Sequence, residues 1–157
     1  MATKLSVLIV TADSAWCDGP GLAGRGFAVR VVGNADVALR SAAAVPTDVI
    51  LVDFTTPGVD GQTLAWSLRE QPRGGRAPLL IMAVRSFGTE ATARAPATPG
   101  ADLSLWRDTP GIAGVIVGVL NRFADFFRAL HATESAATTA RGPTAYRPRQ
   151  QVRHLHR

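Results

Sequence analysis

The chain of 157 residues contains a single cysteine, Cys17. A disulfide bond within the chain is therefore impossible, and this cysteine content is typical of proteins in a reducing compartment. Long hydrophobic runs are also absent. The apolar stretch at residues 5–10 is shorter than the hydrophobic region of a signal peptide, and the stretch at 111–120 is about half as long as a membrane span. We therefore expect a cytoplasmic protein with no membrane partner.

Motifs of the common nucleotide-binding and hydrolytic enzymes are scarce as well. The chain has no G-x-x-x-x-G-K-[ST] phosphate-binding loop and no Ser/His/Asp set typical of nucleophilic catalysis. Residues 19–24 (GPGLAG) do match G-x-G-x-x-G, the glycine pattern of dinucleotide-binding loops. They contain a proline and lie well beyond the preceding apolar run, whereas that pattern belongs at a strand–helix turn. We predict that the protein is not an enzyme.

Charge is unevenly distributed along the chain. Residues 1–132 contain 12 Lys and Arg against 11 Asp and Glu, whereas residues 133–157 contain five Arg against one Glu. The pI of about 10.9 therefore describes the C-terminal segment, and nucleic acid is not the partner that we expect. This segment also lacks aliphatic clusters and cannot offset the entropy of ordering. We predict one domain at 1–132 and a basic, disordered tail at 133–157.

Five short apolar runs indicate β-strands. They are Leu5–Val10, Phe27–Val32, Val49–Phe54, Leu79–Val84 and Leu103–Trp106. Each run is nearly continuous rather than alternating, which is typical of strands in a parallel sheet whose two faces are both covered.

Helical segments lie between these runs. Asn34 is the expected N-cap of one helix, and Asp60 or Gly61 begins another. Apolar residues at helical spacing predict a long helix over 111–132. The glycines of residues 17–26 disfavour the helix that a regular alternation requires there. The order of strands and helices predicts an α/β fold with a doubly wound parallel sheet.

The third apolar run ends on an acid, Asp53, at the start of a turn rich in Pro and Gly. In an open parallel sheet, functional residues gather beyond the carboxyl ends of the strands. The other residues expected at this edge are Thr11, Ala12, Asp13, Ala83 and Arg107. Asp53 is therefore expected where other molecules reach it.

Two motifs accompany this acid. Pro57, Asp60 and Gly61 follow Asp53 with the spacing P-x-x-D-G, and residues 100–107 read GADLSLWR. In this order they resemble the receiver domain of bacterial response regulators, the CheY-like fold, over almost the whole predicted domain. The resemblance implies a flavodoxin-like sheet of five parallel strands in the order 2-1-3-4-5. It also implies that Asp53 lies at the position of the family's phosphoacceptor.

The neighbouring residues depart from the family's pattern. The resemblance places Thr11 and Ala12 where the family has two acids that bind Mg²⁺, with Asp13 adjacent to them. Ala83 lies at the position of a Ser or Thr whose hydroxyl bonds the phosphoryl group. Arg107 lies at the position of a Lys, and a planar guanidinium differs in shape from a compact ammonium.

These departures decide what we expect of the site. Phosphoryl transfer depends on positioning and on charge neutralisation, so we expect no catalytic residue, and Mg²⁺ only in an ordinary receiver. Asp13 and Asp53 are the weak candidate metal ligands, and for Asp13 we favour the role of N-cap of a short helix over that of a metal ligand. We predict a partly exposed ion pair between Arg107 and Asp53, which contributes on the order of 1 kcal/mol. Trp106 is interpreted as a packing residue, with stacking on Arg107 as the alternative.

The sequence therefore predicts a stand-alone, atypical response-regulator receiver in a bacterial phosphorelay or two-component pathway. It would act by protein–protein interaction with weak or no phosphorylation. The expected partners are signalling proteins, among them a histidine kinase or a downstream effector, and a homodimer is a further option. One alternative is a functional receiver phosphorylated on Asp53. Others are a nucleic-acid-associated adaptor that uses the Arg-rich tail and a nucleotide-binding enzyme that uses the glycine-rich segment.

Overall fold

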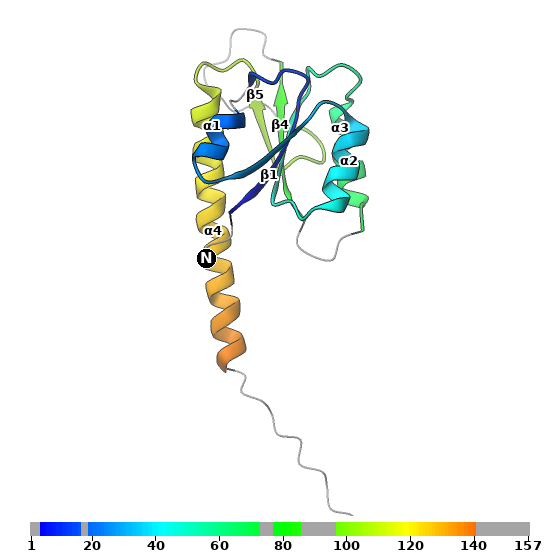
Figure 1. The fold of residues 1–157 in the computed structure, drawn as a ribbon. Coiled ribbons are helices and arrows are strands. Elements are labelled where there is room, and N and C mark those ends of the chain that lie inside the picture. Colours follow the sequence, from blue (N-terminus) through cyan, green and yellow to red (C-terminus); the bar gives the residue numbers. More distant parts are fainter. Residues whose placement is uncertain (1–3, 17–18, 73–76, 86–96, 141–157) are drawn as a thin grey trace, which may run out of the picture. The chain divides into compact units, whose positions relative to one another are not determined.

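The computed structural model describes residues 4–16, 19–72, 77–85 and 97–140 (Figure 1). The strands are β1 (Ser6–Val10), β2 (Ala28–Val32), β3 (Val49–Asp53), β4 (Leu79–Val84) and β5 (Leu103–Trp106). The helices are α1 (Gly19–Gly24), α2 (Ala35–Ala44), α3 (Gly61–Glu70) and α4 (Ile112–Ala140). The chain divides into two compact units, Met1–Asn121 and Arg122–Arg157.

The five strands form one parallel sheet in the order β2-β1-β3-β4-β5. This confirms the predicted architecture and strand order. β4 and β5 also have the predicted bounds, whereas β1, β2 and β3 are each one residue shorter than the apolar runs that indicated them. Because all five strands run in the same direction, their carboxyl ends meet at one edge of the sheet.

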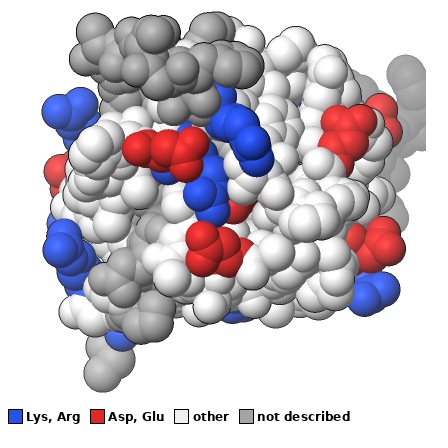
Figure 2. All heavy atoms as spheres, turned by 90° about the horizontal axis from the view of Figure 1, so that it is seen from above, with Lys and Arg blue, Asp and Glu red and all other residues white. Residues whose placement is uncertain are grey.

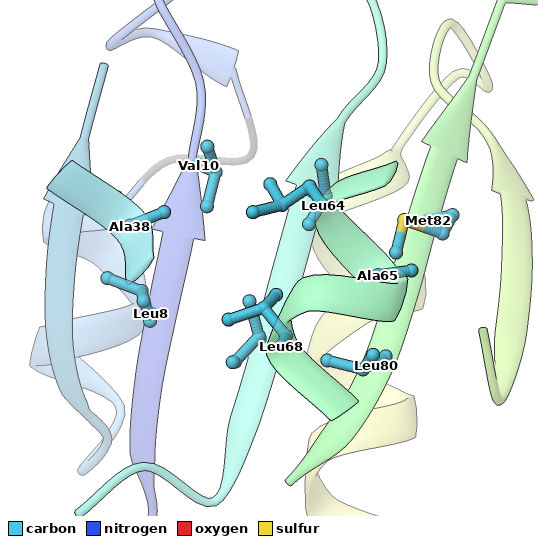
Figure 3. Close-up of a cluster of buried hydrophobic side chains, with 10 residues drawn as sticks. Leu8, Val10, Ala38, Leu64, Ala65, Leu68, Leu80 and Met82 are labelled. Atoms are coloured by element: carbon cyan, nitrogen blue, oxygen red, sulfur yellow. The ribbon is translucent and has the colours of Figure 1, made fainter. Parts of the chain in front are cut away.

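Helices α2 and α3 cover one face of this sheet (Figure 1), and a buried apolar cluster fills the space between them and the strands (Figure 3). Its members are Leu8, Val10, Ala38, Ile50, Val52, Leu64, Ala65, Leu68, Leu80 and Met82. Burial of this apolar surface is the main favourable contribution to folding. It fixes β1, β3 and β4 relative to one another, and so fixes the spacing of their carboxyl ends.

Polar caps begin the two helices on this face. The side chains of Asn34 and Asp60 accept backbone N–H groups from the first turns of α2 and α3, as predicted. Gly61 begins α3 directly beneath an aromatic ring, and a Cβ atom at this position would overlap the ring of Phe54. The glycine therefore allows α3 to start close to the end of β3.

In the first unit, α1 and the first turns of α4 lie on the opposite face of the sheet (Figure 1). Ile116 and Leu120 of α4 are fully buried there, as is Leu22 of α1. This confirms the prediction of a helix that begins near residue 111 and covers one face. None of the described helices, α4 included, combines the length and hydropathy that a membrane crossing requires.

Helix α4 extends beyond the predicted end at residue 132. It continues to Ala140, so residues 133–140 are helical, and the prediction of disorder from residue 133 was wrong for them. The sequence argument considered the lack of aliphatic residues, whereas these residues extend a helix that has already formed, which costs less than nucleating a new one. Residues 141–157 lie outside the described residues, and the division into domain and tail stays a prediction.

The glycine-rich segment after β1 forms the short helix α1. The three glycines of the G-x-G-x-x-G pattern, Gly19, Gly21 and Gly24, all lie within this helix. In a dinucleotide-binding fold the glycines form the turn between strand and helix, where the pyrophosphate binds. The glycines of the pattern in this chain are helical instead, and the alternative of a nucleotide-binding enzyme stays a prediction.

Candidate functional site

Asp53 is the last residue of β3, and its side chain is only 1% exposed. The parallel register places Ala83 of β4 beside it and Leu105 of β5 beyond. Thr11 and Arg107 directly follow β1 and β5. Residues that are far apart in the sequence therefore meet around Asp53 at the carboxyl edge of the sheet, as predicted.

Both carboxylate oxygens of Asp53 accept hydrogen bonds. Oδ1 accepts the backbone N–H of Thr55 at 2.9 Å and its hydroxyl at 2.7 Å. Oδ2 accepts the hydroxyl of Thr11 at 2.8 Å. A buried carboxylate is costly unless hydrogen bonds and an opposite charge replace the lost water. The two threonines supply the hydrogen bonds.

Arg107 supplies the opposite charge and connects three carboxylates. Its Nε donates to Asp53 Oδ1 at 3.0 Å, and its Nη2 donates to Asp13 Oδ2 at 3.0 Å. Its Nη1 donates to Asp108 Oδ1 at 3.3 Å. Asp13 and Asp108 are about half exposed. Figure 2 views this edge of the molecule and shows acidic and basic side chains next to one another near its middle.

The predicted ion pair between Arg107 and Asp53 is thus confirmed, but its surroundings differ from the prediction. The Arg107 side chain is 17% exposed and Asp53 is buried, so water screens the pair much less than a surface pair. The sequence could not show that the turn after β3 covers the acid. Removing either partner alone should therefore cost more than the expected 1 kcal/mol, because it leaves a charge or its donors unpaired.

Trp16 contacts Arg107 from the segment that follows β1. Its indole Nε1 donates to the backbone carbonyl of Arg107 at 3.2 Å. The guanidinium carbon lies 5.4 Å from the centroid of the indole, within the range of a cation–π interaction. The sequence analysis named Trp106 as the alternative stacking residue, and the structure corrects this to Trp16. The two residues are separated by 91 positions, and no sequence pattern marks their contact.

Electrostatic contributions oppose one another at this site. Burial of Asp53 raises its pKa, but hydrogen bonds from the two threonines and from Arg107 outweigh burial and bring the pKa below the usual aspartate value. Burial of Arg107 lowers its pKa, but hydrogen bonds to Asp53 and Asp13 outweigh burial and raise it. Both groups are therefore charged at neutral pH.

The segment after β1 is ordered around Asp13. Its Oδ1 accepts the backbone N–H of Ala15 at 3.1 Å, so the side chain closes a turn, where the sequence predicted the N-cap of a short helix. Its own N–H donates to the hydroxyl of Thr11. Ala12 contributes a backbone N–H, which donates to the hydroxyl of Thr56 at 3.2 Å. This last bond joins the segment after β1 to the turn after β3.

Pro57, Asp60 and Gly61 shape the turn after β3 and make no contact with Asp53 among the described interactions. Asp60 caps α3, and Gly61 lies against Phe54. Gly58, between them, has φ 74°, in the left-handed region that favours glycine. The P-x-x-D-G spacing therefore describes how the chain passes from strand to helix.

With this geometry the chain is similar to solved receiver domains. A putative response regulator from Chloroflexus aurantiacus J-10-fl has a TM-score of 0.62 and 21% identity, over 78% of this chain and 99% of that one. A CheY-like response regulator receiver domain from Methylobacillus flagellatus has a TM-score of 0.61 and 17% identity, over 77% and 99%. The chain has the CheY-like receiver fold.

Another solved receiver is that of a sensor histidine kinase from Pseudomonas aeruginosa PAO1, with a magnesium ion coordinated in its active site cleft. It has a TM-score of 0.56 and 21% identity, over 78% of this chain and 99% of that one. No protein-family model and no curated protein matches the chain. At these identities the likeness establishes the receiver fold, and the functional argument must come from the site.

The receiver fold implies a Mg²⁺ site, and the residues present do not fit one. Mg²⁺ demands near-octahedral oxygen ligands. Within the part of the chain that the structure describes, no three His, Cys, Asp or Glu side chains gather as metal ligands. The guanidinium of Arg107 lies between the carboxylates of Asp13 and Asp53. Thr11 donates to the other oxygen of Asp53. A cation and a donor thus already take up the oxygens that a metal would need.

Sequence reasoning found most of this receiver site but not all of it. Ala83 lies beside Asp53 in the sheet and, as predicted, has no hydroxyl to offer. The residues that it missed include Thr55, Thr56 and Trp16. A signal for the contact with Thr55 existed, because an aspartate at the start of a turn commonly accepts the backbone N–H of the residue two positions later.

Proposed function

We propose that the protein is a receiver-type signalling module that binds other signalling proteins without phosphorylation of Asp53. Its partners would be a histidine kinase or a downstream effector of a two-component-type pathway in the cytoplasm. In this proposal the carboxyl edge of the sheet keeps one conformation and presents it to the partner. An ordinary switch would instead shift between two conformations with different partner affinities.

The environment of Asp53 is the observation that supports this proposal. A phosphoryl donor must approach a carboxylate oxygen in line, and the transfer depends on positioning and on neutralised charge. Asp53 is buried, and each of its oxygens already accepts hydrogen bonds. Exposing a carboxylate oxygen of Asp53 to a phosphoryl donor would first break hydrogen bonds to this charged group. Each such hydrogen bond stabilises by about 1.5–3 kcal/mol.

The residues around Asp53 would also give a phosphoryl group little stabilisation. Ala83, the neighbour in β4, has no side-chain donor. Arg107 is the only described cation that contacts Asp53, and it also donates to Asp13 and Asp108. Its charge is therefore already shared among carboxylates, so less remains for a transferring group.

One observation favours the alternative of a functional receiver. Asp53 ends β3 at the carboxyl edge of a receiver fold, with a cationic side chain within hydrogen-bonding distance. The alternative of a nucleic-acid-associated adaptor depends on the arginines of residues 141–157, which lie outside the described residues. It stays a prediction.

The experiment is phosphorylation by acetyl phosphate with Mg²⁺, followed by intact-mass spectrometry. We expect no phosphoryl adduct on the wild type, with the Asp53→Asn variant as the negative control. A receiver known to accept phosphate from acetyl phosphate, treated in parallel, shows that the reagent is active. A stoichiometric adduct that is absent from Asp53→Asn would overturn the proposal and establish the functional receiver.

A further inference from the structure

We propose that Arg107 is the built-in cation of this site, positioned by Trp16, and that it takes the place of a divalent metal ion between Asp13 and Asp53. The inference depends on the proposed function, because it names the device that keeps the site in one state. Arg107 and Trp16 are positioning residues here, since neither contacts a substrate.

The first argument for the proposal is the geometry of the Arg107 guanidinium. Two nitrogens of one planar group, Nε and Nη2, each donate at 3.0 Å to a different carboxylate. Asp53 ends β3 and Asp13 lies in the segment after β1, so one side chain from the end of β5 connects all three. A divalent cation bound by two carboxylates also neutralises them and fixes their distance. Arg107 does both with directed hydrogen bonds.

The second argument is that Trp16 holds Arg107 in this position. Its indole contacts Arg107 at two points, with Nε1 on the backbone carbonyl and the ring face on the guanidinium. Trp16 follows Asp13 in the same segment, so this segment contacts the guanidinium with a carboxylate and with an aromatic face. The side chain of Arg107 cannot leave Asp53 without losing the stacking, and its backbone cannot move without losing the indole hydrogen bond.

The third argument concerns the charges that Arg107 neutralises. Among the described ion pairs, Arg107 is the cation that joins Asp13, Asp53 and Asp108. Without it, the carboxylates of Asp13 and Asp53, between which the guanidinium lies, would have no described cation between them. Neighbouring like charges disfavour one another and attract a cation. Removal of the guanidinium should therefore create a divalent-cation site that the wild type lacks.

The first experiment is calorimetric titration with Mn²⁺, which prefers oxygen ligands. We expect no saturable binding by the wild type at millimolar Mn²⁺, and saturable binding by Arg107→Ala. Adding Asp13→Asn to that variant should abolish the binding. Arg69→Ala, which removes the arginine of another ion pair, is the matched control and should show no saturable Mn²⁺ binding. Saturable binding by the wild type, or none by a folded Arg107→Ala, would overturn the proposal.

The second experiment needs no Arg107 variant, so it remains decisive if Arg107→Ala fails to fold. The Nε–H resonance of Arg107 is followed by ¹⁵N NMR while its hydrogen exchange is measured. We expect slow exchange in the wild type, faster exchange in Trp16→Phe, and loss of the resonance to rapid exchange in Trp16→Leu. Trp66→Phe changes an exposed tryptophan of α3 and should leave the resonance unchanged. An unaltered resonance in folded Trp16→Leu contradicts the role of Trp16.

The two proposals fail separately. A phosphoryl adduct on the wild type contradicts the proposed function. The Mn²⁺ titration and the Arg107 resonance test only which group acts as the cation.

Discussion

Two arginine–aspartate pairs lie at opposite ends of the same short strand, β5. At its start, Asp102 pairs with Arg69 of α3 at 2.7 Å, with side chains 39% and 27% exposed. At its end, Arg107 pairs with Asp53 at 3.0 Å, with side chains 17% and 1% exposed. The pair with the shorter distance is the more exposed one. Distance alone is therefore a poor guide to what each pair contributes.

The difference lies in what surrounds each carboxylate. Asp102 keeps access to water, and its Oδ2 accepts both Arg69 and the backbone N–H of Leu80. Asp53 has lost its water and depends on protein donors for both oxygens. An exposed pair exchanges protein contacts for water when it breaks, whereas a buried pair leaves an unpaired charge. The first pair helps to place β5, and the second fixes the state of the site.

Removal of the buried pair's arginine should have the largest effect. Arg107→Ala leaves Asp53 buried without its counter-charge, and we expect the free energy of unfolding to fall by about 3 kcal/mol. Denaturant titration monitored by circular dichroism measures the loss.

A double variant tests the cause of that loss. Asp53→Asn combined with Arg107→Gln removes both charges, and it should be less destabilised than Arg107→Ala alone. If the double variant were destabilised by the sum of the two single changes, the pair would behave as two independent residues, and the distinction between the two ends of β5 would fail.

A smaller effect should appear in acid. The pKa of Asp53 lies below its value in the unfolded chain, so its stabilising contribution is present above about pH 4 and is lost as the pH falls through the folded-state pKa. Asp53→Asn lacks this contribution. The difference in unfolding free energy between wild type and Asp53→Asn should therefore be constant near neutral pH and shrink below about pH 4. A difference that grew in acid would mean that burial, rather than hydrogen bonding, dominates this pKa.

The sequence predicted the parts of this structure that depend on repeated local signals. Continuous apolar runs located the five strands, and Asn34 and Asp60 marked two helix starts. The meeting of Arg107 with Asp53 was also predictable, because parallel topology brings the ends of β3 and β5 to one edge. That prediction came from the topology of the fold and not from a local sequence pattern around either residue.

The parts that the sequence missed depend on single long-range contacts or on the path of a loop. Trp16 reaches Arg107 across 91 positions, and its role depends on how the segment after β1 turns at Asp13. The burial of Asp53 depends on Thr55 folding back over it. The extent of α4 was missed for another reason, because the apolar pattern ends before the helix does, and a helix that has formed is extended at lower cost than a new one is nucleated.

The smallest effect should come from the exposed pair. Arg69→Ala removes the ion pair with Asp102 and the hydrogen bonds to the carbonyls of Gly100 and Pro78, yet water replaces all three, so we expect a loss below about 1 kcal/mol. Because the pair is exposed, molar salt should reduce the loss further, whereas the loss for Arg107→Ala should change little with salt. Denaturant titrations at low and high salt measure both, and Arg40→Ala, an exposed arginine of α2, controls for the removal of a positive charge. Equal salt dependence of the Arg69 and Arg107 variants would show that the two ends of β5 do not differ in screening. The assignment of the site at Asp53 to a fixed, water-excluded state would then lose its physical basis.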